Sequence, residues 1–237
     1  MKPFDKKNRN SWFACLLMLA VALIAYPRLP EEIPIHFNAA GQVDGTGPRY
    51  HVFLMPGLAA LMLIISRVTP RIDPRRTNYG KFQRQYHQIF FVITLLLLFT
   101  QLYIIAVSLY PQLIRHFNMG VWMPFLAGLM LVFFGNMMPK FKSNFFTGIK
   151  TPWTLADEQV WYRTHRLVGK LWVVCGFLTI LLAFLPPVWK LYIFFPLILV
   201  MVAVPYVYSY LVFQRIQKQN EEKDAGQDQD TDPPDVL

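Results

Sequence analysis

The stretch "IFFVITLLLLFTQLYIIAVSL", Ile89–Leu109, contains 21 consecutive residues and no charged side chain. A helix rises 1.5 Å per residue, so a block of about 20 apolar residues spans the hydrocarbon layer of a bilayer. The apolar residues fill the whole block, whereas a helix on the surface of a soluble protein has a single apolar stripe. Because lipid offers backbone groups no other partner, the block is predicted to be a membrane-spanning helix.

Similar apolar blocks recur along the chain. Of its 237 residues, 54% are hydrophobic and only 16% are charged, whereas soluble domains carry about 25% charged residues. The sequence therefore predicts an all-α integral membrane protein with a six-helix transmembrane bundle. The predicted spans are Trp12–Tyr26, Tyr50–Ser66, Ile89–Leu109, Gly120–Met138, Leu167–Leu185 and Leu191–Phe213.

Lysine and arginine concentrate in alternate loops. One face holds 19 of these residues, and the opposite face holds four: Arg28, Arg49, Arg115 and Lys190. Basic residues favour the cytoplasmic side, so both termini are predicted to be cytoplasmic. The chain is predicted to have three parts. The first is a membrane half, 1–110, with extracellular loop 27–50 and cytoplasmic loop 67–88. The second is a membrane half, 111–215, with cytoplasmic loop 139–166, and the third is a disordered acidic tail, 216–237.

The formal net charge of +9 does not indicate direct binding of nucleic acid, because the charge follows the predicted topology. Seven of the 14 acidic residues lie in the last 17 positions, and the basic residues lie in alternate loops. The two cysteines lie within apolar blocks, so no disulfide framework is indicated. The sequence contains no phosphate-binding glycine loop and no zinc motif, and we expect no cofactor.

The predicted external loop reads "PRLPEEIPIHFNAAGQVDGTGPRY", Pro27–Tyr50. Ile33, Ile35 and Phe37 alternate with other residues, which is typical of a short extended segment, and turns are expected at Gly41 and at Asp44-Gly45. The histidines near this face match no metal-binding spacing, so no metal site is expected. Contact with an extracellular molecule is the favoured role. The candidate residues for that contact are Pro34, His36, Phe37, Asn38, Gly41 and Asp44.

On the opposite face, "TGIKTPWTLADEQVWYRTHR", Thr147–Arg166, alternates aromatic and basic residues that suit anionic lipid headgroups. Thr154 is the predicted N-cap of a helix that continues into the fifth span, with Asp157 in its first turn. The segment is interpreted as an interfacial element that faces a cytoplasmic partner. The candidate partner-binding residues are Gly148, Lys150, Thr151, Pro152, Trp153, Thr154, Glu158, Trp161, His165 and Arg166.

Two other functions have less support in the sequence. Glu158 and His165 stand about two helical turns apart, near 10 Å, which is too far for a direct acid–base pair, although His87 could complete a site. No nucleophile accompanies them, so an enzyme is not predicted. A small-molecule transporter or a membrane-embedded sensor is the alternative. A transporter needs a polar path, whereas the spans hold only Gln101, Asn136 and a few hydroxyl groups.

Two motifs resemble a known family. "GNMMPKFKSNFFTGIKTPWTLADEQVWYRTHRLVGKL", Gly135–Leu171, resembles the signature of the SdpI/YfhL family of bacterial toxin-immunity membrane proteins. "LPEEIPIHFNAAGQVDG", Leu29–Gly45, is similar to the external loop of the domain that precedes it in longer members. Lys150 stands where the family commonly has arginine, which keeps the charge but loses the planar fork of donors.

The resemblance implies a multi-pass protein of the bacterial plasma membrane, without a cofactor, that protects the cell from an exported peptide toxin. It also implies a signalling form in which the protein holds a winged-helix transcriptional repressor at the membrane. In that scheme the candidate residues of the external loop face the toxin, and those of the cytoplasmic loop bind the repressor.

Overall fold

The computed structural model describes residues 8–229 of the chain. Within this range, six helices are long and apolar enough to cross a membrane, which confirms the predicted fold class. They are α1 Arg9–Ala25, α2 Leu54–Ile72, α3 Tyr79–Leu109, α4 Met119–Met137, α6 Glu158–Leu182 and α7 Pro187–Gln229.

Short elements connect these helices. The strands β1 Glu32–Phe37 and β2 Val43–Pro48 form an antiparallel hairpin, and α5 covers Pro152–Ala156. Single 3-10 turns complete the chain path at η2 Tyr26–Arg28, η3 Arg49–Phe53, η4 Arg76–Asn78, η5 Pro111–Arg115 and η6 Met138–Lys140.

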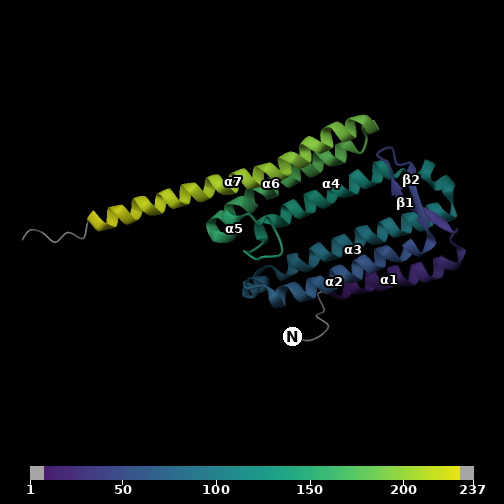
Figure 1. The fold of residues 1–237 in the computed structure, drawn as a ribbon, viewed down its shortest axis with the longest axis horizontal. Helices are drawn as coiled ribbons and strands as arrows, with labels where there is room; N and C mark the ends of the chain where they lie inside the picture. Colours follow the sequence, from purple (N-terminus) through teal and green to yellow (C-terminus); the bar gives the residue numbers. More distant parts are fainter. Residues whose placement is uncertain (1–7, 230–237) are drawn as a thin grey trace, which may run out of the picture.

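The helices form two packed groups (Figure 1). Helices α1, α2 and α3 pack on one another, while α4 packs on α6 and α6 packs on α7. The hairpin lies at one end of the bundle. The start of α1, the α2–α3 connection and α5 lie at the other end, beyond which α7 extends. The two regions predicted to carry function therefore lie at opposite ends of the molecule.

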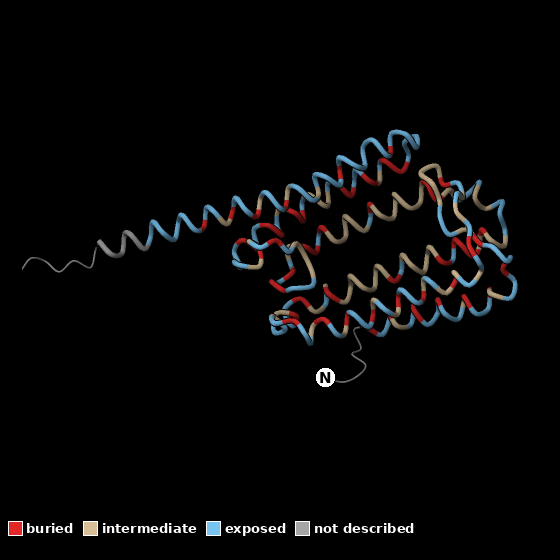
Figure 2. Tube along the Cα trace, viewed as in Figure 1, coloured by how far each residue is buried: buried red, intermediate tan, exposed pale blue. Residues whose placement is uncertain are grey.

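Many residues on the outer sides of the helices are exposed (Figure 2), and large apolar residues are common among them. On α7, for example, Phe195 and Leu199 are two-thirds exposed. Exposed apolar surface on this scale would be unfavourable in water, whereas lipid solvates it without cost. The burial pattern therefore fits a protein whose surrounding medium is hydrocarbon.

Glycines bring α4 and α6 into close contact. A Cβ atom added at Gly128 would lie 2.6 Å from the backbone oxygen of Gly176. A Cβ atom added at Gly135 would lie 2.6 Å from the backbone oxygen of Gly169. Small residues let helix backbones approach closely, and in lipid this gain in packing is a main source of helix association. The two glycine pairs therefore determine how near the helices lie.

The two polar residues noted in the spans bond to backbone oxygens. Gln101 on α3 is buried and its Nε2 donates to the carbonyl oxygen of Met18 on α1, at 2.9 Å. Asn136 donates to Val132 in its own helix, also at 2.9 Å. Gln101 therefore links two helices of the N-terminal group.

The predicted cytoplasmic loop 67–88 is shorter in the structure. Helix α2 continues to Ile72 and α3 begins at Tyr79, so only residues 73–78 connect them. Hydropathy indicates where a chain leaves lipid, but helical hydrogen bonds continue into the polar region beyond it. The predicted loop 67–88 therefore includes the ends of both helices, and its place outside lipid stays a prediction.

The tail also differs from the prediction. Residues 216–229, expected to be disordered, continue helix α7. Lysine, glutamate and glutamine are good helix formers, and Lys218 and Glu222 form a pair one turn apart, 3.8 Å between charged atoms. Residues 230–237 lie outside the described part of the chain.

Candidate functional site

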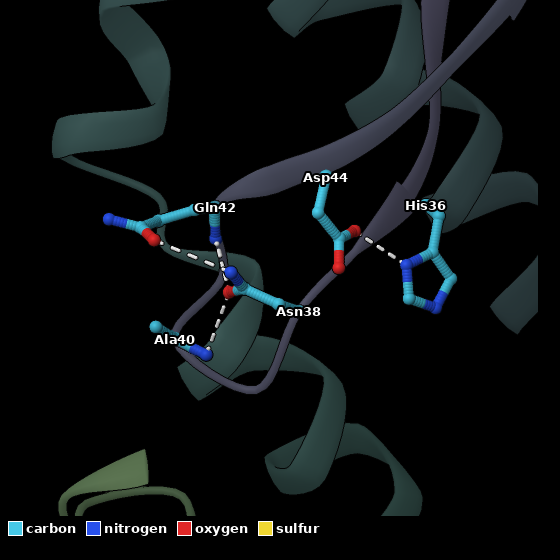
Figure 3. A network of polar contacts seen from close by, with 5 residues as sticks. All are labelled: His36, Asn38, Ala40, Gln42 and Asp44. Atoms are coloured by element: carbon cyan, nitrogen blue, oxygen red, sulfur yellow. Dashed lines mark hydrogen bonds and ion pairs between the residues drawn. The ribbon is translucent and has the colours of Figure 1, made fainter.

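The hairpin is closed by a turn around one asparagine (Figure 3). Oδ1 of Asn38 accepts the backbone N–H groups of Ala40 and Gln42, each at 3.0 Å. Gly41 has a φ of 77°, a conformation that favours glycine. The predicted extended segment and the turn at Gly41 are confirmed. The turn expected at Asp44-Gly45 is wrong, because these residues lie within β2.

One polar pair lies on the hairpin surface. Nδ1 of His36 and Oδ1 of Asp44 are 2.5 Å apart, and their side chains are 71% and 42% exposed (Figure 3). Phe37 instead points toward the helices, where its ring meets Tyr103 edge-on at 5.5 Å. Of the six residues predicted to face an extracellular molecule, His36 and Asp44 are exposed. The other four, Pro34, Phe37, Asn38 and Gly41, are partly or fully buried.

The hairpin turn is attached to the start of α4. Asn118 caps α4 by accepting the backbone N–H of Gly120 at 2.7 Å, and its Nδ2 donates to the Ala40 oxygen at 3.0 Å. From the start of α7, Nζ of Lys190 donates to the Gly120 oxygen. The hairpin, α4 and α7 therefore meet at one junction.

At the other end, residues 141–157 form a folded connection, hereafter the inner connection. Asn144 is fully buried at its centre. Its Nδ2 donates to the oxygens of Lys142 and Thr147, and its Oδ1 accepts the N–H groups of Phe146 and Thr147. A single side chain thus satisfies four backbone groups, so residues 142–147 are ordered without regular secondary structure.

The α2–α3 connection binds the inner connection. The buried carboxylate of Asp73 accepts the Phe145 N–H at 2.9 Å and the Tyr79 hydroxyl at 2.8 Å. Arg75 donates to the hydroxyl of Ser143 and, at 2.6 Å, to the Leu155 oxygen. Charged groups in hydrogen bonds of this kind bind more strongly than neutral ones. These contacts join the two halves of the molecule at this end.

His165 holds the inner connection to α6. It is fully buried, its Nδ1 donates to the Trp161 oxygen at 2.8 Å, and its Nε2 accepts the Ile149 N–H at 3.0 Å. Only a neutral ring with the proton on Nδ1 makes both bonds. Gly148 has a φ of 105°, and a Cβ atom there would lie 2.5 Å from Nε2 of His165. Glycine is therefore required beside the ring.

Two caps organise the chain before α6. Thr151 is the N-cap of α5 and accepts the Thr154 N–H at 3.2 Å, while the Thr154 hydroxyl accepts the Thr151 N–H at 2.9 Å. The prediction of Thr154 as the N-cap is therefore wrong by three residues, because the short helix α5 precedes α6. Asp157 caps α6 by accepting the N–H groups of Gln159 and Val160.

Helix α5 is docked on α7. The Thr151 hydroxyl donates to the Ser209 hydroxyl at 2.9 Å. The ring of Trp153 meets Tyr206 and Tyr210 on α7, with centroids 5.0 Å and 5.1 Å away. Helix α7 therefore contacts both candidate regions. It reaches the hairpin junction through Lys190 and α5 through Tyr206, Ser209 and Tyr210.

Of the ten predicted partner-binding residues, four are buried: Thr151, Thr154, Trp161 and His165. Gly148 and Trp153 are partly buried, and the exposed ones are Lys150, Pro152, Glu158 and Arg166. The buried residues serve to fold the segment, whereas the exposed ones can meet a partner. Since His165 is enclosed and Glu158 faces outward, the structure does not join them as an acid–base pair.

A groove of about 830 Å³ lies beside the inner connection. Its charged lining consists of Lys81, Lys142, Glu158, Arg163, Arg166 and Lys170, and we call it the basic groove. Five cations and one carboxylate suit an anionic group such as a phosphate or an acidic side chain. The groove is therefore a candidate contact surface for an acidic partner.

Sequence reasoning missed several of these positions, including Asp73, Asn118 and Asn144. Asp73 carries a signal, since it is the only acid among six basic residues between Arg67 and Arg84. A lone carboxylate in a strongly basic loop indicates an internal partner. Asn118 and Asn144 carry no comparable signal, because asparagine is common in surface loops.

Comparison with known proteins finds two kinds of similarity. Residues 140–209 match the SdpI/YfhL protein family, and over 215 residues the chain is 28% identical to the Immunity protein SdpI of Bacillus subtilis (strain 168). That similarity covers 89% of this chain and 98% of that protein. These two matches show that the chain is similar to the SdpI/YfhL protein family. The SdpI/YfhL match covers all of the inner connection, all of α6 and much of α7.

Residues 13–60 match a domain of unknown function, DUF1648, which covers most of α1, the hairpin and the start of α2. A stretch of 64 residues is 33% identical to an uncharacterized protein of Archaeoglobus fulgidus, covering 25% of this chain and 35% of that protein. No solved structure matches the chain. Similarity to the SdpI/YfhL family and six apolar helices support a multi-pass protein of the bacterial plasma membrane.

Proposed function

We propose that this protein is a membrane immunity protein that protects the bacterium against an exported peptide toxin. The observation that carries the proposal is the similarity to Immunity protein SdpI, which extends over 98% of that protein. It therefore includes both the hairpin end and the inner connection. An immunity role needs no catalytic site, and the SdpI/YfhL family is not an enzyme family.

In this scheme the hairpin faces the medium, where an exported peptide arrives, and both chain termini lie in the cytoplasm. The uneven distribution of basic residues supports the orientation, since 19 of 23 belong to one predicted face. The exposed pair His36 and Asp44 supports the hairpin as the surface that meets the toxin.

We further propose a signalling form in which the cytoplasmic end binds a winged-helix transcriptional repressor. The exposed residues Lys150, Glu158 and Arg166 and the basic groove supply the contact surface. Helix α7 contacts both the hairpin junction and α5, so a toxin that favours one position of α7 would alter the docking surface. A ligand shifts such an equilibrium only by binding one arrangement more tightly than the other.

The immunity proposal is tested by survival. A toxin-sensitive bacterium that expresses the chain should survive exposure to candidate exported peptides better than cells with an empty vector. Gly57→Ala, at a position with no atom within 4 Å of the added Cβ, serves as a mutation control that should protect fully. No gain in survival against any of the peptides would contradict the proposal.

The signalling form is tested by the location of the repressor. A fluorescent winged-helix repressor encoded beside the gene should move to the membrane after toxin is added, and Glu158→Ala or Arg166→Ala should reduce this movement. Lys218→Ala, exposed on α7 outside the groove, is the matched control. A repressor that stays in the cytoplasm in toxin-treated cells would rule out the signalling form while leaving immunity unaffected.

A further inference from the structure

A cavity of about 410 Å³ lies beneath the hairpin, between the starts of α4 and α7. This volume falls within the range of about 300–1,000 Å³ typical of small-ligand sites. Its lining is predominantly apolar and includes Ile35, Phe37, Ile104, Met123, Leu182 and Phe194. A ligand that fills it must therefore present apolar groups to most of its surface.

One cation lines this cavity. Lys190, in the first turn of α7, is 9% exposed, and its Nζ donates to the backbone oxygen of Gly120. Among residues 8–223, no carboxylate lies within ion-pair distance of this ammonium group. Burying a charge without a counter-charge is costly, so a bound anion would be strongly favoured here.

We propose that the cavity binds an apolar peptide segment that carries one carboxylate, paired with Nζ of Lys190. The inference rests on the proposed function, which brings an exported peptide to the hairpin. Ile35 to Ala39, five consecutive residues of β1 and its turn, form one wall, so the occupant also contacts the hairpin.

Binding would change the junction described above. A carboxylate oxygen competes with the Gly120 oxygen for the Lys190 ammonium group. Gly120 is also the residue whose N–H bonds to Asn118, which in turn holds the hairpin turn at Ala40. The ligand therefore acts on the point where α7, α4 and the hairpin meet.

The test uses the full chain in phosphatidylcholine vesicles and two fluorescent probes. These are N-dansylated Ile-Leu-Phe with a free C-terminal carboxylate and the same peptide as its carboxamide. The carboxylate probe should bind at least about tenfold more tightly, as expected when one partner of a buried charge pair is removed. Lys190→Gln should abolish the preference, whereas Lys190→Arg and the control Arg115→Gln should keep it. Equal or undetectable binding of the two probes would overturn the proposal.

A second variant covers the case in which Lys190→Gln does not fold. Ala127 on α4 lines the cavity, so Ala127→Phe should fill it and weaken both probes without changing Lys190. Binding to Ala127→Phe at the wild-type affinity would contradict the assignment of the cavity. Adding phosphatidylglycerol to the vesicles should leave binding unchanged. Displacement of the probe by this lipid, lost in Lys190→Gln, would identify a lipid site and overturn the peptide proposal.

Different results would reject the immunity proposal and the ligand assignment of the cavity. Protection in the survival assay without a carboxylate preference would reject the ligand assignment and retain immunity. A carboxylate preference that depends on Lys190, in a chain that protects against no toxin, would reject immunity and retain the chemistry of the cavity.

Discussion

Ile149 donates its backbone N–H to Nε2 of His165 over 3.0 Å, although the two residues stand 16 positions apart in the chain. The same ring donates through Nδ1 to Trp161 and stacks on the indole of Trp161 with centroids 4.0 Å apart. A histidine in a polar, membrane-flanking motif suggests chemistry or ligand binding. Here its full burial and its two bonds make it the residue that attaches the inner connection to α6.

Replacing this histidine tests its structural role. His165→Phe keeps a ring but removes the acceptor, leaving the Ile149 N–H unsatisfied at a cost of about 1–3 kcal/mol. The melting temperature of the purified protein in detergent should therefore fall. Tyr162→Phe, on the exposed face of the same helix, is the control and should melt like wild type. An unchanged melting temperature for His165→Phe would show that the bond contributes nothing.

Alanine substitution should lower the stability at Gly128, in the contact between α4 and α6, and raise it at Gly57, which is outside that contact. Gly128→Ala places a Cβ atom 2.6 Å from the Gly176 oxygen, so the helices must separate, with an overpacking cost of about 1–3 kcal/mol. Gly57→Ala meets no atom within 4 Å and should gain up to about 1 kcal/mol from helix propensity. Thermal unfolding distinguishes them, and equal melting temperatures would argue against close packing at this crossing.

Adjacent arginines offer a matched pair at the α2–α3 connection. Arg75 bonds to Ser143 and Leu155, whereas Arg76 is exposed. Arg75→Ala should destabilise the attachment of the inner connection by about 1.4 kcal/mol or more. The equilibrium constant for its detachment should therefore rise about tenfold. Trypsin added to inverted vesicles should then cleave at Lys142 and Lys150 correspondingly faster. The same acceleration in Arg76→Ala would mean that the effect is not specific to these bonds.

The exposed pair on the hairpin should affect function more than stability. Ion pairs in solvent contribute little, so His36→Ala and Asp44→Ala should leave the melting temperature near that of wild type. Each should nevertheless lower survival in the presence of toxin. Glu32 and Thr46 form a second surface contact on the same hairpin, at 2.7 Å, and Thr46→Ala provides the control. Full protection by both His36→Ala and Asp44→Ala would remove this pair from the toxin-facing surface.

Membrane immersion is the part of the fold that a sequence predicts best, because it depends on local composition. The uncharged block Ile89–Leu109 lies within α3, and the block and the helix both end at Leu109. Their starts differ, since α3 begins at Tyr79, ten residues before the block, and the first turns of the helix are polar. Hydropathy measures where lipid begins, and the backbone hydrogen bonds of a helix do not stop there.

Pairings between distant residues lie beyond what composition predicts. The alternation in β1 predicts an extended segment, but its partner β2 reads "VDGTGP", which has little strand propensity and pairs through the Asn38 turn. The bond between Asp73 and Phe145 joins residues 72 positions apart. Neither residue type specifies that partner. The structure divides the ten candidate partner-binding residues between the inner connection and α6, and it separates the buried ones from the exposed ones. Their role in binding a partner stays a prediction.

The orientation of the chain in the membrane is the claim on which immunity and signalling both depend, and cysteine labelling tests it most directly. Cys15 and Cys175 are free and buried, so a background with both replaced by alanine can carry single cysteines at Thr46→Cys on the hairpin and Lys150→Cys on the inner connection. In intact cells, a membrane-impermeant maleimide should label Thr46→Cys at once and Lys150→Cys only after permeabilisation. Labelling of Lys150→Cys in intact cells, with Thr46→Cys protected, would contradict the account.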